Sequence, residues 1–193
     1  MDTKKKVLGE FERLRDRYIP LMERRTGLNL GQIEIKSLIE ENCKDDLLGR
    51  TMEIKALKRM GVVKPTVLYN PVEETIQVPT FLWNELDKSN NQEADEIMIH
   101  ELTHHVWTKT PNRIPLQSVP SVVGEGFAVY GEQHWFADFL PAKRNLTPKS
   151  NYHPDYIVGE EWVRKLVEEY GDQILLKIPA RYGEFVTWAE GEK

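Results

Sequence analysis

The sequence is poor in cysteine, in basic charge and in long apolar runs, and each shortage excludes a class of protein. Its single cysteine, Cys43, rules out an internal disulfide and offers any metal only one thiolate, so we expect a buried, unreactive thiol. The formal net charge of −5 gives no basic surface, and we expect no nucleic-acid partner. No apolar run reaches the about 18 residues of a membrane helix, so we expect no membrane partner.

The first residues also lack the apolar core of a secretory signal, because charged side chains recur throughout them. We therefore expect a cytoplasmic protein and attach no meaning to the glycosylation sequon that begins at Asn145. The 193 residues are 40% hydrophobic and 30% charged, which is enough for one globular domain with its own core.

Hydrophobic spacing predicts a small α+β half followed by a helical half. We expect one domain over residues 1–193, with an upper subdomain at about 1–109 and a lower helical subdomain at about 110–193. Pro79 directly follows the last predicted strand, which favours an edge strand there. The predicted strands are 32–36, 66–69 and 75–78, and the predicted helices are 4–25, 44–60, 80–86, 92–108, 124–139, 154–170 and a short one to about 178.

The segment from His100 to His104 reads His-Glu-x-x-His within a predicted helix. Residues four apart share one helix face, so two imidazoles at this spacing can bind one tetrahedral zinc. Glu101, about 100° around the helix, is in the position that a general base for a metal-activated water needs.

This short pattern arises by chance in roughly one chain of this size in a few hundred, and two ordinary core or surface histidines are the alternative interpretation. The helix favours zinc, because its apolar stripe lies nearly opposite the two histidines. This apolar stripe consists of Met98, Ile99, Leu102 and Val106. His105 should point away from the two histidines and be neutral.

A catalytic zinc usually takes three protein ligands, so a third must lie elsewhere in the chain. Glu125 falls on the apolar face of the predicted helix 124–139, where an unpaired carboxylate would cost several kcal/mol. Glu132 falls on the same face and could accept the free N–H of a ligand histidine. The other downstream candidates are His134 and Asp138, on the opposite and wet side, and His153.

The sequence resembles the gluzincin zinc metallopeptidases in two motifs. These are His-Glu-x-x-His and, after twenty further residues, Glu-Gly-Phe-Ala-Val-Tyr. The likeness is to the aminopeptidase N and leukotriene-hydrolase branch and to minimal peptidase-MA-like domains, and it covers about residues 60–178. The resemblance implies that Glu125 is the third zinc ligand and that Glu132 matches a glutamate of that family. The spacing before Glu125 is two residues longer than the family's usual eighteen.

The segment Asp155-Tyr156-Ile157-Val158-Gly159 is similar to the family's Tyr-x-x-Gly, whose phenol stabilises the tetrahedral intermediate. The resemblance therefore implies a catalytic role for Tyr156. Its spacing also puts Tyr156 on one inward helix face, so a core tyrosine is the alternative. His153, one turn earlier, could also face substrate. The expected inward face comprises Tyr156, Gly159, Val163, Val167 and Tyr170.

The amine-anchoring motif Gly-x-Met-Glu-Asn of that branch is absent, and Thr75-Ile76-Gln77-Val78 stands in its place. This favours an endopeptidase over an aminopeptidase, although Glu73 and Glu74 stay candidates for holding a free amine. We expect a zincin-like α+β fold, with a small sheet and the active-site helix above a cleft and a mostly helical lower subdomain. Substrate would pair with the edge strand near Ile76.

These patterns predict a zinc-dependent metallopeptidase that binds one Zn²⁺ per chain and hydrolyses a peptide or protein substrate. Glu101 would activate the water on the zinc, and Tyr156 would stabilise the oxyanion. One alternative is a catalytically silent zinc protein that binds a peptide or protein partner. Another is a latent form, in which the N-terminal helix or the tail 181–193 covers the cleft.

Overall fold

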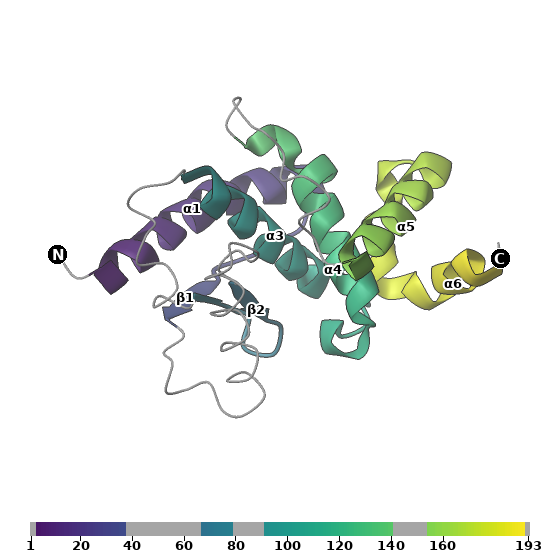
Figure 1. The fold of residues 1–193 in the computed structure, drawn as a ribbon, viewed down its shortest axis with the longest axis horizontal. Helices are drawn as coiled ribbons and strands as arrows, with labels where there is room; N and C mark the ends of the chain where they lie inside the picture. Colours follow the sequence, from purple (N-terminus) through teal and green to yellow (C-terminus); the bar gives the residue numbers. More distant parts are fainter. Residues whose placement is uncertain (1–2, 38–66, 79–90, 141–153, 192–193) are drawn as a thin grey trace.

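A computed structural model of the chain describes residues 3–37, 67–78, 91–140 and 154–191 (Figure 1). These residues form a mostly helical α+β structure, with five α-helices and a small three-stranded mixed sheet. The predicted helices 44–60 and 80–86 lie outside the described residues, as do Cys43, Asn145 and His153. None of the described helices is both long and apolar enough to cross a lipid bilayer. The division of the chain near residue 109 stays a prediction.

Helix α1 (Thr3–Thr26) confirms the first predicted helix and forms part of the core. The apolar residues of its inner face recur every three or four positions and are at most 4% exposed. Gly27, with φ 71°, ends the helix in the left-handed conformation that glycine adopts readily. Since α1 contributes a whole face to the core, it differs from the removable cover that a latent form would use. That face consists of Val7, Phe11, Leu14, Tyr18 and Met22.

The sheet consists of β1 (Glu34–Ser37), β2 (Leu68–Asn70) and β3 (Thr75–Val78), in the order β1-β3-β2. Strand β1 runs parallel to β3, and β2 runs antiparallel to it. The prediction that Ile76 lies on an edge strand is therefore wrong, because β3 is central among the described strands. Among the strands that the structure describes, β2 lies at one edge, and it packs against α3.

Helix α3 (Asn91–Lys109) confirms the predicted helix 92–108 and lies between α1 and α4 (Figure 1). The predicted apolar stripe from Met98 to Val106 is fully buried. On the α1 side, Tyr18 donates a hydrogen bond to the buried carboxylate of Asp95. The histidines are thus carried by a helix that the core holds on one face.

Helix α4 (Ser121–Tyr130) begins three residues earlier than predicted and continues as a π-helical turn, η4 (Gly131–Trp135). A short 3₁₀ segment, η5 (Ala137–Phe139), follows, so the single α-helix predicted for 124–139 is wrong in its second half. The change in winding occurs at Gly131, where a Cβ would lie 2.5 Å from Oγ1 of Thr103 on α3. The close approach of this backbone to the branched side chain of Thr103 therefore requires glycine at this point.

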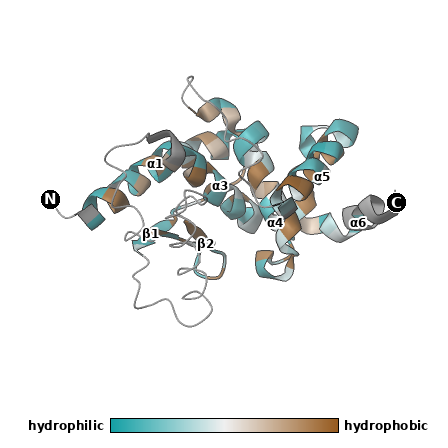
Figure 2. Cartoon of the chain, in the orientation of Figure 1, coloured by the Kyte–Doolittle hydropathy of each residue, from teal (hydrophilic) through white to brown (hydrophobic). Residues whose placement is uncertain are grey.

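Helix α5 (Pro154–Tyr170) begins at Pro154 and ends before Gly171, as predicted. It crosses α4 where the backbones of Gly126 and Gly159 touch, because a Cβ on Gly126 would lie 2.3 Å from Cα of Gly159. Figure 2 shows hydrophobic residues where these two helices meet and hydrophilic ones toward the far end of α5. Tyr170 is 42% exposed, so its predicted inward position is wrong.

The chain after α5 differs from the predicted short helix to about residue 178. A 3₁₀ segment, η7 (Asp172–Ile174), leads into helix α6 (Ile178–Gly191), which is kinked at Arg181. The backbone N–H of Ile114 donates a hydrogen bond of 2.7 Å to the carbonyl of Pro179, which ties the start of α6 to the loop after α3.

Candidate metal centre

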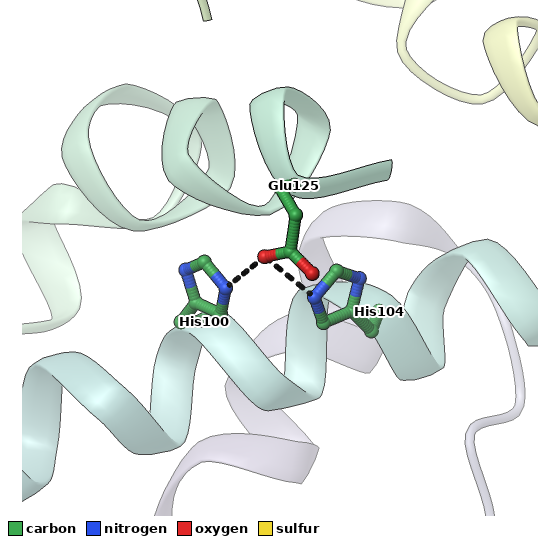
Figure 3. A group of neighbouring side chains, drawn as sticks. All are labelled: His100, His104 and Glu125. Carbon is green, nitrogen blue, oxygen red and sulfur yellow. Dashed lines mark hydrogen bonds and ion pairs between the residues drawn. The ribbon is translucent and has the colours of Figure 1, made fainter. Parts of the chain in front are cut away.

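Helices α3 and α4 bring His100, His104 and Glu125 together (Figure 3). The two imidazoles project from one face of α3, with ring centroids 5.1 Å apart and ring planes at 82°. Glu125, in the second turn of α4, points its carboxylate between them. One ligand atom from each side chain lies within 4.8 Å of the other two, so the predicted His-His-Glu group is confirmed as a candidate metal site.

The spacing of the ligand atoms fits a tetrahedral metal ion. Oε2 of Glu125 lies 3.1 Å from Nε2 of His100 and 3.6 Å from Nε2 of His104. Ligand atoms at about 2.0–2.1 Å from a tetrahedral zinc would lie about 3.3–3.4 Å from one another. Two imidazole nitrogens and one carboxylate oxygen are donors that divalent transition metals accept. The three residues therefore fit such an ion with small side-chain adjustments.

The metal-free group has the electrostatics of a partly buried ion pair. Burial raises the pKa of Glu125, but the imidazoles of His104 and His100 outweigh it and hold the pKa well below its ordinary value. Burial lowers the pKa of His100, but the carboxylates of Glu125 and Glu132 outweigh it and raise the pKa well above its ordinary value. The side chain of Glu125 is still 27% exposed, which leaves the group open to solvent.

Glu132 lies on the other side of His100. Its Oε2 is 3.4 Å from Nδ1 of that imidazole, and its side chain is only 4% exposed. The sequence predicts a partner for a ligand histidine, and the structure identifies that histidine as His100. The π-helical turn η4 carries Glu132 to this position.

Glu101 is 6% exposed, on the same turn of α3 as the two histidines. Burial raises its pKa to about 7, although the neighbouring imidazoles of His100 and His104 lower it. A carboxyl group with such a pKa can take up and release a proton near neutral pH. Its predicted role as general base stays a prediction.

Tyr156 lies in the first turn of α5, and the next turn of that helix contacts α4 beside Glu125. Gly159, one turn further on, touches Gly126, and Gly126 directly follows Glu125. Tyr156 is half-buried, and its catalytic role stays a prediction.

The other candidates among the described residues have partners outside the metal group. Glu73 forms an ion pair of 3.0 Å with Lys36, and Glu74 pairs with Lys109. His134 pairs with the buried Glu160 at 2.9 Å. As predicted, the exposed Asp138 lies on the wet side, and it pairs with Arg25 on α1.

Two residues beside the metal group have contacts that the sequence pattern does not predict. His105 is turned away from the metal group as predicted, and burial lowers its pKa, but its ring also joins two distant segments. Its Nδ1 lies 2.9 Å from the hydroxyl of Tyr69, and its Nε2 lies 2.9 Å from the carbonyl of Leu30. Tyr69 precedes His105 by 36 residues, so no local pattern could signal the pairing.

Comparison of the chain with known protein families, with curated proteins and with solved structures finds no match, so the gluzincin resemblance rests on the residues and their geometry alone.

Proposed function

We propose that this chain is a zinc-dependent metallopeptidase that hydrolyses peptide bonds. The observation that carries the proposal is the convergence of His100, His104 and Glu125 within 4.8 Å, with Glu101 buried on the same helix turn. Three protein ligands leave one tetrahedral position for water or substrate, as in catalytic zinc sites. When bound, zinc would polarise the scissile carbonyl and make water acidic enough to lose a proton near neutral pH.

Glu101 would move the proton in this reaction. Its carboxylate would accept a proton from the attacking water and then deliver it to the leaving amine. A pKa of about 7, raised by burial, suits both transfers, because neither protonation state is strongly favoured near neutral pH. Glu132 would keep the imidazole of His100 oriented through Nδ1.

Tyr156 would donate its hydroxyl to the oxyanion of the tetrahedral intermediate. The contact between Gly126 and Gly159 supports this role, because it fixes α5 against α4 directly beside Glu125. A larger residue at either glycine would push the first turn of α5 away from the metal group.

The substrate would be a peptide or protein that binds in extended form along β2. Strand β2 takes the place of the strand near Ile76 as the predicted pairing partner of the substrate. Strand β3 is paired on both sides, whereas β2 is an edge strand of the described sheet and packs against α3. Glu73 and Glu74 follow β2, and both are engaged with lysines. These pairs support cleavage of internal bonds over capture of a free amino terminus.

The test is peptide cleavage by the full-length chain loaded with one equivalent of zinc, read by mass spectrometry on a peptide library. Wild type should cleave, and Glu101→Gln should retain zinc and fold but lose about 10²–10⁴-fold in rate. Glu161→Gln, which changes an exposed glutamate on α5, is the matched control and should cleave like wild type.

A Glu101→Gln variant that cleaves at the wild-type rate would contradict the proposal. One bound zinc with no cleavage of any peptide would instead support a silent protein that binds a peptide or protein partner. Activity that appears only after limited proteolysis would identify a latent peptidase.

A further inference from the structure

The two histidines of the metal group are held differently. Nδ1 of His100 faces the carboxylate of Glu132 at 3.4 Å. Nδ1 of His104 is buried and has no hydrogen-bond partner in the part of the chain that the structure describes. Metal-binding histidines are usually oriented through a hydrogen bond of the second ring nitrogen. His104 therefore needs another source of orientation.

The ring of Tyr69 supplies a contact of that kind. It lies nearly parallel to the imidazole of His104, with a 12° angle between the planes and 6.3 Å between centroids. This is the offset-stacked arrangement that aromatic rings prefer. Because Tyr69 lies on the edge strand β2, the imidazole is held between its own helix and the sheet.

Tyr69 is itself fixed by His105. The carbonyl oxygen of Leu30 can only accept a hydrogen bond, so Nε2 of His105 carries the proton at that 2.9 Å contact. In the neutral ring Nδ1 is then an acceptor, and the Tyr69 hydroxyl donates to it across 2.9 Å. His105 is fully buried, which limits the competition of water for its two bonds. One hydrogen bond thus fixes the hydroxyl of Tyr69 to His105, and a second fixes His105 to the backbone of Leu30.

Tyr69 contacts two successive residues of α3 with different parts. Its ring faces the imidazole of His104, and its hydroxyl bonds to the ring of His105. Tyr69 therefore connects a histidine of the metal group to the buried histidine that follows it on the same helix.

We propose that Tyr69 is a positioning residue of the metal site, which fixes the imidazole of His104 by ring contact, with His105 as its anchor. This requires only that the site binds a metal, and the expected loss of kcat rests in addition on the proposed peptidase function. Tyr69 itself touches no reacting atom.

The experiment compares Tyr69→Ala, Tyr69→Phe and His105→Leu in the full-length chain, with Co²⁺ in place of zinc as a spectroscopic probe. Co²⁺ absorption reports ligand geometry, so Tyr69→Ala should shift the spectrum and weaken zinc binding by about 10-fold. Tyr69→Phe and His105→Leu keep the ring and should give smaller changes of the same kind. Peptide cleavage by Tyr69→Ala should lose about 10-fold in kcat with KM unchanged.

Tyr170→Phe is the matched control, because this tyrosine is exposed on α5, and it should match wild type in every measurement. Thermal unfolding shows which variants are folded. If Tyr69→Ala does not fold, the comparison of Tyr69→Phe with wild type decides the test. Folded Tyr69 variants with the wild-type Co²⁺ spectrum, zinc affinity and kcat would overturn the proposal. If wild type cleaves no peptide, the peptidase function fails, and the spectrum and zinc affinity still decide whether Tyr69 positions His104.

Discussion

The carboxylate of Glu132 lies 3.4 Å from Nδ1 of His100, while Nε2 of the same imidazole faces Glu125 at 3.1 Å. One ring is thus held between two carboxylates that come from the same chain segment, one from α4 and one from the π-helical turn that follows it. The inner carboxylate can bind a metal together with Nε2. The outer one can only orient the ring and raise its basicity.

Replacing Glu132 by glutamine should therefore weaken zinc binding without abolishing it. We expect a zinc dissociation constant about 10-fold higher, because the amide keeps the shape but loses the charge that favours the donating Nδ1–H. Competition with a chromophoric chelator measures it, and Glu161→Gln is the control. An unchanged dissociation constant in Glu132→Gln would remove this residue from the site.

Zinc binding to the metal-free chain should release roughly one to two protons at pH 7. His100 is protonated there, because Glu125 and Glu132 outweigh burial and raise its pKa, and Glu101, with a pKa of about 7, is partly protonated. The release should decline as the pH rises through the pKa of His100. Titration calorimetry in buffers of different ionisation enthalpy counts these protons, and Glu132→Gln should release fewer. Heats that are identical in all buffers would contradict the ion-pair description.

The contact between α4 and α5 should not tolerate a side chain. Gly126→Ala would put a Cβ 2.2 Å from the carbonyl carbon of Gly159, where only backbone movement can relieve the overlap. We expect the free energy of unfolding to fall by about 3 kcal/mol, measured by urea denaturation, with weaker zinc binding because Glu125 is adjacent. Gly9→Ala, with no atom within 4 Å of its Cβ, should be neutral or up to about 1 kcal/mol stabilising. Equal stability of Gly126→Ala and wild type would show that the helices can separate freely.

The helices that carry the metal group could be predicted from the sequence because their signals are local. The apolar stripe of α3 and the terminal glycines of α1 and α5 are set by residues within one turn. The spacing of His100 and His104 belongs to the same class, since a helix alone places both rings on one face. Glu125 could be found because a carboxylate on an apolar face requires a partner.

The features that could not be predicted depend on contacts between distant segments. The π-helical turn begins where Gly131 presses against Thr103, and nothing near Gly131 in the sequence signals that contact. The central position of β3 follows from its pairing with β1, 41 residues earlier by the register of Glu34 with Thr75. The contacts of Tyr69 with His104 and His105 likewise join residues 35 and 36 positions apart.

The central claim is that one divalent ion is shared by His100, His104 and Glu125, and zinc stoichiometry at fixed free zinc tests it most directly. Wild type and Asp138→Ala, which removes an exposed carboxylate near the same segment, should each hold one zinc per chain after dialysis against a chelator-buffered zinc solution. Glu125→Ala should lose its zinc. Loss of a residue that only orients a ligand weakens metal binding by up to about 100-fold, and loss of a ligand itself should weaken it more. A folded Glu125→Ala chain that still holds one zinc at the same free concentration would contradict the account.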